Sequence, residues 1–480
     1  MQKVSCPSCG APVEFKSHAS VMAVCGYCKS TLLKDADSVR DMGKMSAVLE
    51  DYSPLQIGTA GSFGGQEFSV VGRIQLRYDA GLWNEWYVLY ADGHGAWLSE
   101  SGGQYTLTEE TEAKAGLPPF EQIRIGAPYG MLGKTYTAAD VRTAQCTGGE
   151  GELPFQVGKG WQAKVADLRS GRSFVTLDYS EGELPKLYAG QAVTLEQLKC
   201  QLLRDEETVK DSAGAYRRRV QALSCPSCGG SLNWVPGVTR QIICPSCRAQ
   251  VDTSTDVAEV MAAGERLERF KTTLELGAQA TIGSAKFQVI GAMLRRDDEG
   301  EEWTEYQLYS PRAGFLWLIE TAEGWQRAKV QDDWPVWNRG ETITLGSQTF
   351  RKLYEYEATV VNAVGAFNWR VQAGDTAQVA EFESGKNRLA SERSQDELTW
   401  SMSTPVGADQ MRAWFGLAVP EKALAPKTDI VKIAEYFLYA IVGLNFIPLM
   451  GAFDETWHYS AVAAAAIWVP AKIMSLMQDE

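Results

Sequence analysis

The sequence predicts a mainly β, multi-domain (α+β) protein with two small cysteine-rich units, two related β-sandwich or barrel modules and C-terminal hydrophobic helices. Three observations lead to this prediction. A four-cysteine pattern occurs twice, the sequence behind each copy is repeated, and a long uncharged apolar run lies near the end of the chain. A length of 480 residues leaves room for about three domains.

Composition and charge narrow the class of protein. The chain is 45% hydrophobic and 22% charged, which is typical of a globular protein. Its formal net charge of −14 argues against a nucleic-acid partner, because such partners call for a basic surface. The N-terminal region has no apolar run of the kind that a signal peptide needs, so we expect a reducing compartment.

The first element is the repeated cysteine cluster. Each copy contains two pairs, with two residues inside each pair and fifteen between the pairs. Four thiolates at this spacing suit the tetrahedral coordination of Zn²⁺ in a closed zinc ribbon. An iron centre and a redox-active thiol pair are the alternatives. We therefore predict two Zn²⁺ ions, bound by Cys6, Cys9, Cys25 and Cys28 and by Cys225, Cys228, Cys244 and Cys247.

The two remaining cysteines lie outside these clusters. Cys146 and Cys200 have no partner at a metal-ligand spacing. We expect both to be buried structural thiols, the usual role of isolated cysteines.

The region behind each cluster is duplicated at an offset of 219 residues. The chain is therefore a tandem repeat of a ribbon and a module of roughly 150 residues. The matched aromatic positions are expected to be core residues. They pair Phe68 with Phe287, Tyr90 with Tyr309 and, after one inserted residue, Trp97 with Trp317.

A weaker repeat lies inside each module. A glycine after an aliphatic residue is followed ten positions later by an aromatic residue, and each pair opens an alternating apolar stretch. This pattern predicts four related β-units, with the glycine at a turn or bulge. The pairs are Gly58 with Phe68, Gly126 with Tyr136, Gly277 with Phe287 and Gly346 with Tyr356.

These signals give an order of domains. Helices are expected behind each ribbon and between the copies, the first from a capping pattern at Ser38 and Asp41. The predicted segments are ribbon 1 at 1–34, a helix at 35–53, β-module 1 at 54–196, a helical linker at 197–222, ribbon 2 at 223–253, a helix at 254–273, β-module 2 at 274–405, a linker at 406–429 and a helical hairpin at 430–480.

The C-terminal hairpin is predicted to span a membrane. Residues 436–453 carry no charge over eighteen positions, and 461–477 form a second, weaker apolar run. Lysines flank the two runs, whereas the polar stretch between them has none, so both ends would face the cytoplasm. The alternative is a buried hairpin that packs on the β-modules.

No catalytic site is predicted. The chain has three histidines, His18, His94 and His458, and none stands in a recognisable catalytic motif. The stretch GKT at 133–135 lacks the earlier glycine of a phosphate-binding loop. We therefore expect no catalytic and no cofactor-binding residues beyond the metal ligands.

The stretches IGTAGSFGGQEFSVVGRIQLRYD and WNEWYVLYADGHGAWLSE resemble the bacterial DUF4178 family, a domain of unknown function. The resemblance covers roughly 54–195 and 274–405, and the second copy departs from it where SPRAG replaces ADGHG. Family members often combine zinc ribbons, this domain and a membrane segment, and tend to be encoded near membrane-stress proteins. The resemblance implies an envelope-associated role and no catalytic residues.

From these observations we expect a membrane-anchored, zinc-binding adaptor or scaffold, not an enzyme, at the inner membrane with most of the chain in the cytoplasm. It would act in an envelope-stress or membrane-remodelling system, with membrane and membrane-associated proteins as partners. The alternative is an accessory or regulatory subunit of a membrane enzyme or transporter that binds a polyamine-like small molecule. An adaptor predicts no deep pocket that gathers ionisable groups with perturbed pKa values.

Overall fold

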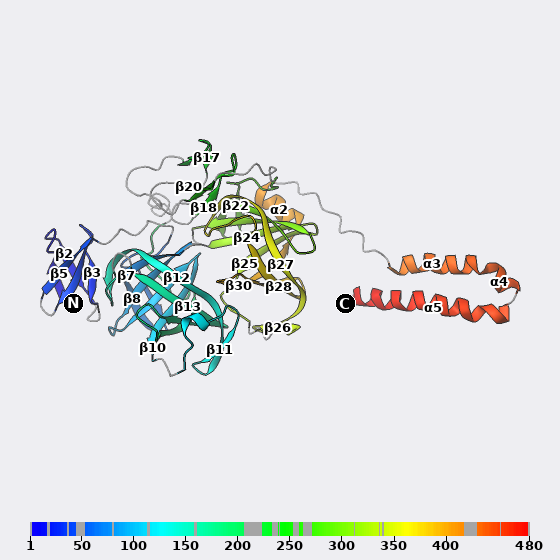
Figure 1. The fold of residues 1–480 in the computed structure, drawn as a ribbon, viewed down its shortest axis with the longest axis horizontal. Helices are drawn as coiled ribbons and strands as arrows, with labels where there is room; N and C mark the ends of the chain where they lie inside the picture. The colour runs from blue at the N-terminus through cyan, green and yellow to red at the C-terminus, as the bar shows by residue number, and fades with distance from the viewer. Residues whose placement is uncertain are drawn as a thin grey trace. The chain divides into compact units, whose positions relative to one another are not determined.

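The computed structural model divides the chain into two compact units, Met1–Leu417 and Ala418–Glu480 (Figure 1). It describes the whole chain except Met1, 17–19, 36–37, 45–52, 79–80, 113–115, 158–160, 206–222, 233–238, residue 240, 253–258, 263–270, residue 312, residue 336, 338–339, 417–429, residue 452 and 479–480.

The first module is a closed antiparallel β-barrel. Its strands follow the order β12–β13–β14–β15–β10–β9–β8–β7, and β7 pairs back with β12 to close the sheet. The barrel strands are β7 (Gln66–Tyr78), β8 (Gly81–Tyr90), β9 (Gly95–Ser101), β10 (Gln104–Thr111), β12 (Lys134–Leu153), β13 (Gln162–Ser170), β14 (Ser173–Asp178) and β15 (Lys186–Val193). Two short strands flank them, β6 (Ala60–Phe63) and β11 (Pro128–Met131), with a 3-10 turn at Phe120–Gln122.

The second module repeats this barrel with the same strand order. Its strands are β22 (Ala285–Arg296), β23 (Glu302–Ser310), β24 (Gly314–Thr321), β25 (Gly324–Val330), β27 (Gln348–Phe367), β28 (Thr376–Ser384), β29 (Asn387–Arg393) and β30 (Leu398–Val406). The flanking strands are β21 (Gln279–Ile282) and β26 (Thr342–Leu345). The predicted mainly β fold class, with two related barrel-like modules, is therefore confirmed.

Alternation along the strands gives each barrel two buried faces. On β8, Trp86 and Val88 point to an outer apolar cluster that also contains Leu55, from the segment before β6. The intervening residues, such as Glu85 and Tyr87, point to the barrel interior, where Tyr87 belongs to a second apolar cluster. The interior face is where the polar residues of interest lie.

Glycines allow the barrel to close where β7 crosses β12. Gly151 has a φ of +72°, and a β-carbon there would lie 2.2 Å from the carbonyl oxygen of Val71. A β-carbon on Gly72 would lie 1.8 Å from the carbonyl oxygen of Glu152. In the second barrel, Gly291 and Gly365 pair at the same crossing. Only glycine permits two backbones to approach this closely.

Each ribbon joins its barrel through a strand. The first ribbon contains β1 (Gln2–Ser5), β2 (Pro12–Phe15), β3 (Met22–Val24), β4 (Ser30–Asp35) and β5 (Ser38–Lys44). The second contains β16 (Leu223–Ser224), β17 (Ser231–Leu232), β18 (Gln241–Ile243), β19 (Gln250–Asp252) and β20 (Glu259–Ala262). β3 pairs with the end of β12, and β18 with the end of β27, so the barrel sheet continues into each ribbon.

Helices were predicted behind both ribbons, at 35–53 and 254–273, and this prediction is wrong for the described residues. Ser38–Lys44 forms β5, which pairs with β4, and Glu259–Ala262 forms β20, which pairs with β19. Pairing with an available ribbon edge outweighs the local helix signal. In the linker predicted to be helical, 197–205 contains no helix, and 206–222 lies outside the described residues.

The strand registers refine the alignment of the two copies. Ser69 pairs with Leu89, and its counterpart Gln288 pairs with Tyr309. Tyr309 therefore corresponds to Leu89 and not to Tyr90, so the inserted residue lies before β23. Residues of β8 and β9 therefore correspond to residues 220 positions later in the second copy. This offset preserves the match of Trp97 with Trp317, which are both half-buried.

The inner repeat is confirmed for three of its four glycine–aromatic pairs. The amides of Gly58, Gly126 and Gly277 each donate to a carbonyl twelve residues later. The fourth pair was misplaced by six residues. In the first module the backbone amide of Ala138 donates to the carbonyl of Ala127, and in the second the amide of Lys352 donates to the carbonyl of Glu341. This match places the repeat at Gly340 and the buried Phe350.

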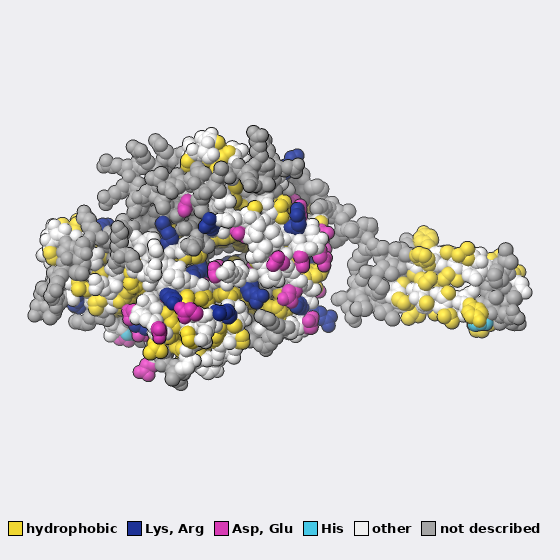
Figure 2. Space-filling model, in the orientation of Figure 1, with side chains coloured by type: hydrophobic (Ala, Val, Ile, Leu, Met, Phe, Trp, Pro, Cys, Tyr) yellow, Lys and Arg dark blue, Asp and Glu magenta, His cyan; other side chains and the backbone are white. Residues whose placement is uncertain are grey.

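The C-terminal unit consists of helices α3 (Ile430–Leu444), α4 (Phe446–Gly451) and α5 (Phe453–Gln478), and α3 packs against α5. A short helix, α2 (Ala408–Phe415), precedes it within the predicted linker at 406–429. Hydrophobic side chains cover much of the visible surface of the α3–α5 unit (Figure 2).

The prediction that this hairpin spans a membrane is wrong. In the part of the chain that the structure describes, no helix is both long and apolar enough to cross a bilayer. The uncharged run at 436–453 is divided among three helices, and the 15 residues of α3 reach only about 22 Å of the roughly 30 Å hydrocarbon core. The 26-residue α5 includes Asp454 and Glu455 near its start, Pro470 inside it and Lys472 beyond. An inner-membrane location thus loses its basis.

Candidate metal centres and a cavity in the second barrel

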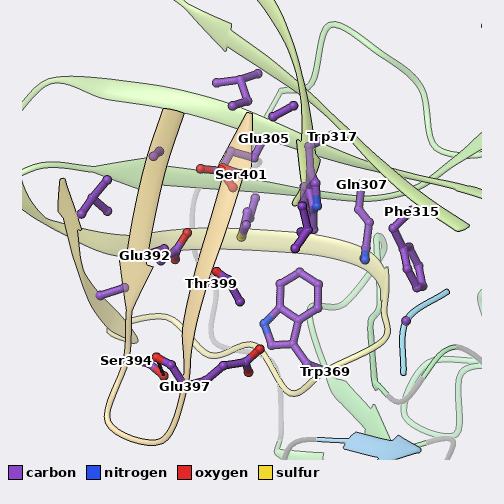
Figure 3. A pocket seen from close by; sticks show the side chains of 18 of the residues that line it. Glu305, Gln307, Phe315, Trp317, Trp369, Glu392, Ser394, Glu397, Thr399 and Ser401 are labelled. Atoms are coloured by element: carbon purple, nitrogen blue, oxygen red, sulfur yellow. Dashed lines mark hydrogen bonds between the residues drawn. The ribbon is translucent and has the colours of Figure 1, made fainter. Parts of the chain in front are cut away.

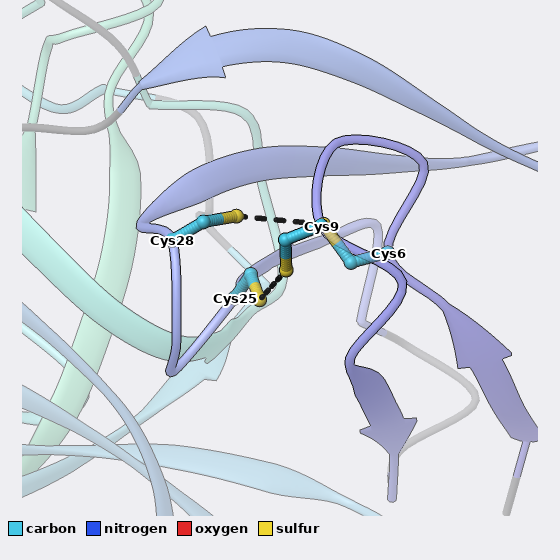
Figure 4. A group of neighbouring side chains, drawn as sticks. All are labelled: Cys6, Cys9, Cys25 and Cys28. Carbon is cyan, nitrogen blue, oxygen red and sulfur yellow. Dashed lines mark hydrogen bonds between the residues drawn. The ribbon is translucent and has the colours of Figure 1, made fainter.

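The structure brings the first four predicted cysteines together. Their sulfur atoms all lie within 4.8 Å of one another, with Cys6 Sγ 3.6 Å from Cys28 Sγ and Cys9 Sγ 3.7 Å from Cys25 Sγ (Figure 4). Cys6 follows β1 and Cys25 follows β3, and each begins a tight turn that aims the next cysteine back. Gly10 and Lys29 donate to the carbonyls of Cys6 and Cys25 from left-handed backbone conformations.

The second cluster has the same geometry. Cys225 Sγ lies 3.6 Å from Cys247 Sγ, and Cys228 Sγ lies 3.7 Å from Cys244 Sγ. Its turns close through amides of Gly229 and Arg248, again with positive φ. In both clusters the first cysteine of each pair is buried, so the sites are anchored at the strand ends.

These distances fit a tetrahedral metal site. Four sulfurs at about 2.3 Å from one ion would lie about 3.8 Å apart, whereas a disulfide would need about 2.05 Å. All ten cysteines are free thiols. Hydrogen bonds from Ser30 lower the pKa of Cys28 to about 6, whereas the neighbouring sulfur of Cys28 raises the pKa of Cys9 to about 12, so Cys28 is the thiol of this pair that ionises first. Each cluster could therefore bind one metal ion.

Polar contacts hold each cysteine cluster to its barrel. Glu152 of β12 accepts hydrogen bonds from the Lys16 amide at 2.8 Å and the Ser20 hydroxyl at 2.9 Å, both in the ribbon loop. In the second copy, Arg248 beside Cys247 donates to the carbonyl of Ala363 on β27 at 3.0 Å. The cysteine clusters are thus joined to the β-framework by polar contacts as well as by strand pairing.

The remaining residues that the sequence singled out show no further site. His94 lies in the turn after β8, next to Asp92 and stacked on Tyr90. His18 lies outside the described residues, and His458 lies in α5 rather than in a loop. Cys146 and Cys200 are partly buried, and burial raises the pKa of Cys200 to about 11, in agreement with inert structural thiols.

The sequence did not predict a large cavity in the second barrel. Its volume is about 1320 Å³, and all eight barrel strands contribute lining residues from their inner faces. Arg295 of β22 is one of these residues. Glu392 comes from β29 and Ser401 from β30 (Figure 3). A smaller part of the lining comes from the first module, including Trp83 and Arg142.

Charged side chains are concentrated inside this cavity. The guanidinium of the buried Arg295 lies 3.3 Å from Glu305 and 2.8 Å from Glu392. Trp303 Nε1 donates to Glu305 at 2.7 Å, and the Tyr356 hydroxyl donates to Glu381 at 2.6 Å. Burial raises the pKa of Glu305, opposed by Arg295.

The first barrel carries carboxylates at the same three interior positions. The strand registers match Glu85 with Glu305, Asp167 with Glu381 and Asp178 with Glu392. Trp83 Nε1 donates to Glu85 at 2.8 Å, the contact that Trp303 makes with Glu305. Burial raises the pKa of Glu85 to about 7, and Asp167 and Asp178 add to the rise.

A tyrosine accounts for a main difference between the two interiors. Tyr188 of β15 is 8% exposed, and its counterpart on β30 is Ser401. Burial raises the pKa of Tyr188, and the charge of its cross-strand neighbour Glu110 adds to the rise, followed by the charges of Asp178, Glu181 and Glu85. The ring takes up space in the first barrel that a serine leaves open in the second. The repeated Trp-x-Glu at 83–85 and 303–305 is the sequence signal that could have revealed these interiors.

Comparisons with known proteins agree with the duplication. A family model described as a domain of unknown function, DUF4178, matches residues 56–195 and again 275–408. No curated protein and no solved structure matches the chain. The two matches cover more than half of the sequence and coincide with the two barrels, so the chain belongs to the DUF4178 family and carries its domain twice.

Proposed function

We propose that this protein is a non-catalytic binding protein in which two structural Zn²⁺ ions stabilise the ribbons and the interior of the second barrel receives a small ligand. The cavity inside the second barrel is the observation that carries this proposal. Binding sites are typically concave, mostly preformed and lined by apolar surface with a few convergent polar groups. The interior of the second barrel has this character.

Zinc is the metal that suits the clusters. Four cysteines leave no coordination position open for a substrate, which is typical of structural rather than catalytic zinc. Both clusters adjoin strands that continue into a barrel. Bound zinc would therefore fix the end of β12 in one module and of β27 in the other.

The cavity favours a ligand-binding role over a pure adaptor. An adaptor that gains avidity from duplication needs two equivalent modules. The two barrels instead differ inside, at Tyr188 and Ser401. An adaptor also predicts no pocket with perturbed ionisable groups, whereas Arg295, Glu305 and Tyr356 all line this cavity and all have shifted pKa values.

The proposal is tested by filling the cavity. Ser401→Tyr copies the residue of the first barrel, and Ser347→Tyr makes the same change in the exposed turn between β26 and β27. A library of small metabolites is screened by thermal shift against the wild-type protein and both variants. A ligand at one hundred times its Kd stabilises the folded state by about 2.7 kcal/mol, which is readily measured.

We expect compounds that raise the Tm of the wild type and of Ser347→Tyr but not of Ser401→Tyr. The Ser401→Tyr protein must retain its metal content and its circular dichroism spectrum. If every stabilising compound acts equally on all three proteins, or if none stabilises the wild type, the barrel interior is not a binding site.

A further inference from the structure

We infer that the interior of the second barrel binds an organic cation, with an ammonium or guanidinium group on an apolar stem. This inference rests on the proposed binding function and specifies its ligand. Fourteen aspartates and glutamates and five lysines and arginines line the cavity and its mouth, which includes the exposed turn between β22 and β23 and Glu100 of the first module. A cavity with this excess of acidic groups attracts cations and repels anions.

The comparison of the two barrels shows where a cation is lacking. Arg142, Arg169 and Lys186 of the first barrel correspond by strand register to uncharged or acidic residues in the second. Lys186, for example, lies opposite Asp178, whereas Thr399 lies opposite Glu392. The second barrel gains two arginines in return, because Arg295 stands where the first has Leu76 and Arg388 stands where it has Phe174. In the second barrel, Tyr356 stands in place of Arg142, Glu383 in place of Arg169 and Thr399 in place of Lys186.

The second barrel therefore keeps three carboxylates with fewer cations of its own. Carboxylates held in a partly dehydrated interior are costly unless a positive charge compensates them. Glu392 is the most accessible of the three, with a side chain 44% exposed. It is the carboxylate that an entering cation would reach without displacing Arg295 from Glu305.

A buried hydrogen-bond acceptor points to a ligand that carries N–H groups. Gln307 is fully buried and lines the cavity, and its Oε1 has no hydrogen-bond partner among the described residues. Its Nε2 already donates to Asn368 at 2.5 Å. A buried carbonyl without a donor costs about 1–3 kcal/mol, which an N–H donor from the ligand would relieve.

Aromatic rings on the same wall suit the rest of such a ligand. Trp317 and Trp369 both line the cavity, with ring centroids 5.4 Å apart, close to Gln307 in Figure 3. Tryptophan faces bind ammonium and guanidinium groups through cation–π attraction and pack well against apolar stems. The wall thus offers a charge partner and an apolar surface together.

A bare metal ion fits the cavity less well. In the described part of the chain, the two cysteine clusters are the only groups of three or more His, Cys, Asp or Glu whose ligand atoms lie within 4.8 Å of one another. Glu305 and Glu392 are also held by Arg295. Calcium and magnesium need six or more oxygens at about 2.0–2.6 Å, which this spacing does not provide.

The test compares probes of equal size and different charge. Calorimetry at neutral pH measures the binding of 4-phenylbutylamine, 4-phenylbutan-1-ol and 4-phenylbutanoate to the full-length, zinc-loaded protein. We expect the amine to bind at least tenfold more tightly than the alcohol and the acid not to bind. Glu392→Gln should weaken the amine about tenfold, the size of one charge-assisted hydrogen bond, and leave the alcohol unchanged.

A matched variant and the filled cavity separate the outcomes. Glu357→Gln makes the same change on the exposed side of β27 and should bind the amine like the wild type. If the alcohol or the acid binds as tightly as the amine, and Ser401→Tyr abolishes that binding, the interior binds ligands but not by charge, and the cation inference is wrong. If the amine binds and Ser401→Tyr does not weaken it, both the inference and the proposed function are overturned. If no probe binds, the cation inference alone is overturned, because the library screen tests the binding function separately.

Discussion

Replacing Glu85 by glutamine should stabilise the protein above neutral pH and leave it unchanged in acid. The pKa of Glu85 is raised from its ordinary value of 4.5 to about 7, first by burial and then by Asp167 and Asp178. The unfolded chain ionises this carboxyl near its ordinary pKa. As pH rises from 4.5 to 7, the unfolded state loses the proton first, so folding stability falls with pH over this window.

The size of the effect follows from the shift. A change of one pKa unit corresponds to about 1.36 kcal/mol, so the rise gives an upper limit of about 3 kcal/mol above pH 7. Glutamine cannot ionise and avoids this penalty. Its amide oxygen can still accept from Trp83 Nε1, as Glu85 does at 2.8 Å, and its amide nitrogen can donate to Ser99.

The assay is urea unfolding of the wild type and Glu85→Gln at pH 5 and pH 8, in the presence of saturating zinc. Subtracting the wild-type free energy of unfolding from that of the variant removes the pH dependence of all distant groups, because their contributions are the same in both proteins. Glu183→Gln, at an exposed position of the same module, controls for the loss of one surface charge. A stabilisation of about 1–3 kcal/mol at pH 8 that falls to about a quarter of that value at pH 5 is expected. Equal effects at both pH values would refute the assignment of Glu85 to a dehydrated interior.

Three further perturbations test the framework. Cys225→Ser should lose one of two bound zinc ions in elemental analysis and have a lower Tm, whereas Cys200→Ser should retain both ions. Wild-type protein that contains less than one equivalent of zinc would contradict the metal assignment. Gly365→Ala should destabilise the protein by at least about 2 kcal/mol more than Gly374→Ala in urea titrations. Both glycines have φ near +94°, but only the first would place a β-carbon 2.5 Å from a backbone oxygen, so equal losses would mean that the crossing is not tight. Deletion of 418–480 should leave a folded protein with both zinc ions, since those residues form a separate compact unit, and loss of either ion on deletion would refute this.

Local sequence signals predicted the elements that local chemistry determines. The cysteine spacing requires tight turns, and the structure places all eight thiols in two groups of four. The duplication and the alternating strands predicted two related β-modules, because period-two burial is visible in a segment such as WYVLY. These features depend on residues close together in the chain.

Features that depend on distant pairing were missed. The segment at Ser38–Lys44 reads locally as a helix, yet β4 offers it an open edge and it becomes a strand. The carboxylates of the barrel interior lie on separate strands, and their encounter is fixed by the register of the whole sheet. The C-terminal apolar run has enough residues to span a bilayer, but it is divided among α3, α4 and α5, and no helix among the described residues is long and apolar enough to cross a membrane.

The two copies keep the same framework and differ in the space that it encloses. Both retain four clustered cysteines, a glycine pair at the strand crossing and three interior carboxylates, with a tryptophan donating to the first carboxylate in each. The cysteine clusters lie next to the ribbon ends of β12 and β27, and the glycines lie at the closing seam, so both belong to the framework. The exchange of Tyr188 for Ser401 changes neither the cysteine clusters nor the glycine crossing, and so can open the interior without loss of the fold. When the framework and the interior of a duplicated barrel vary independently, one copy can keep a filled interior for stability while the other binds a ligand.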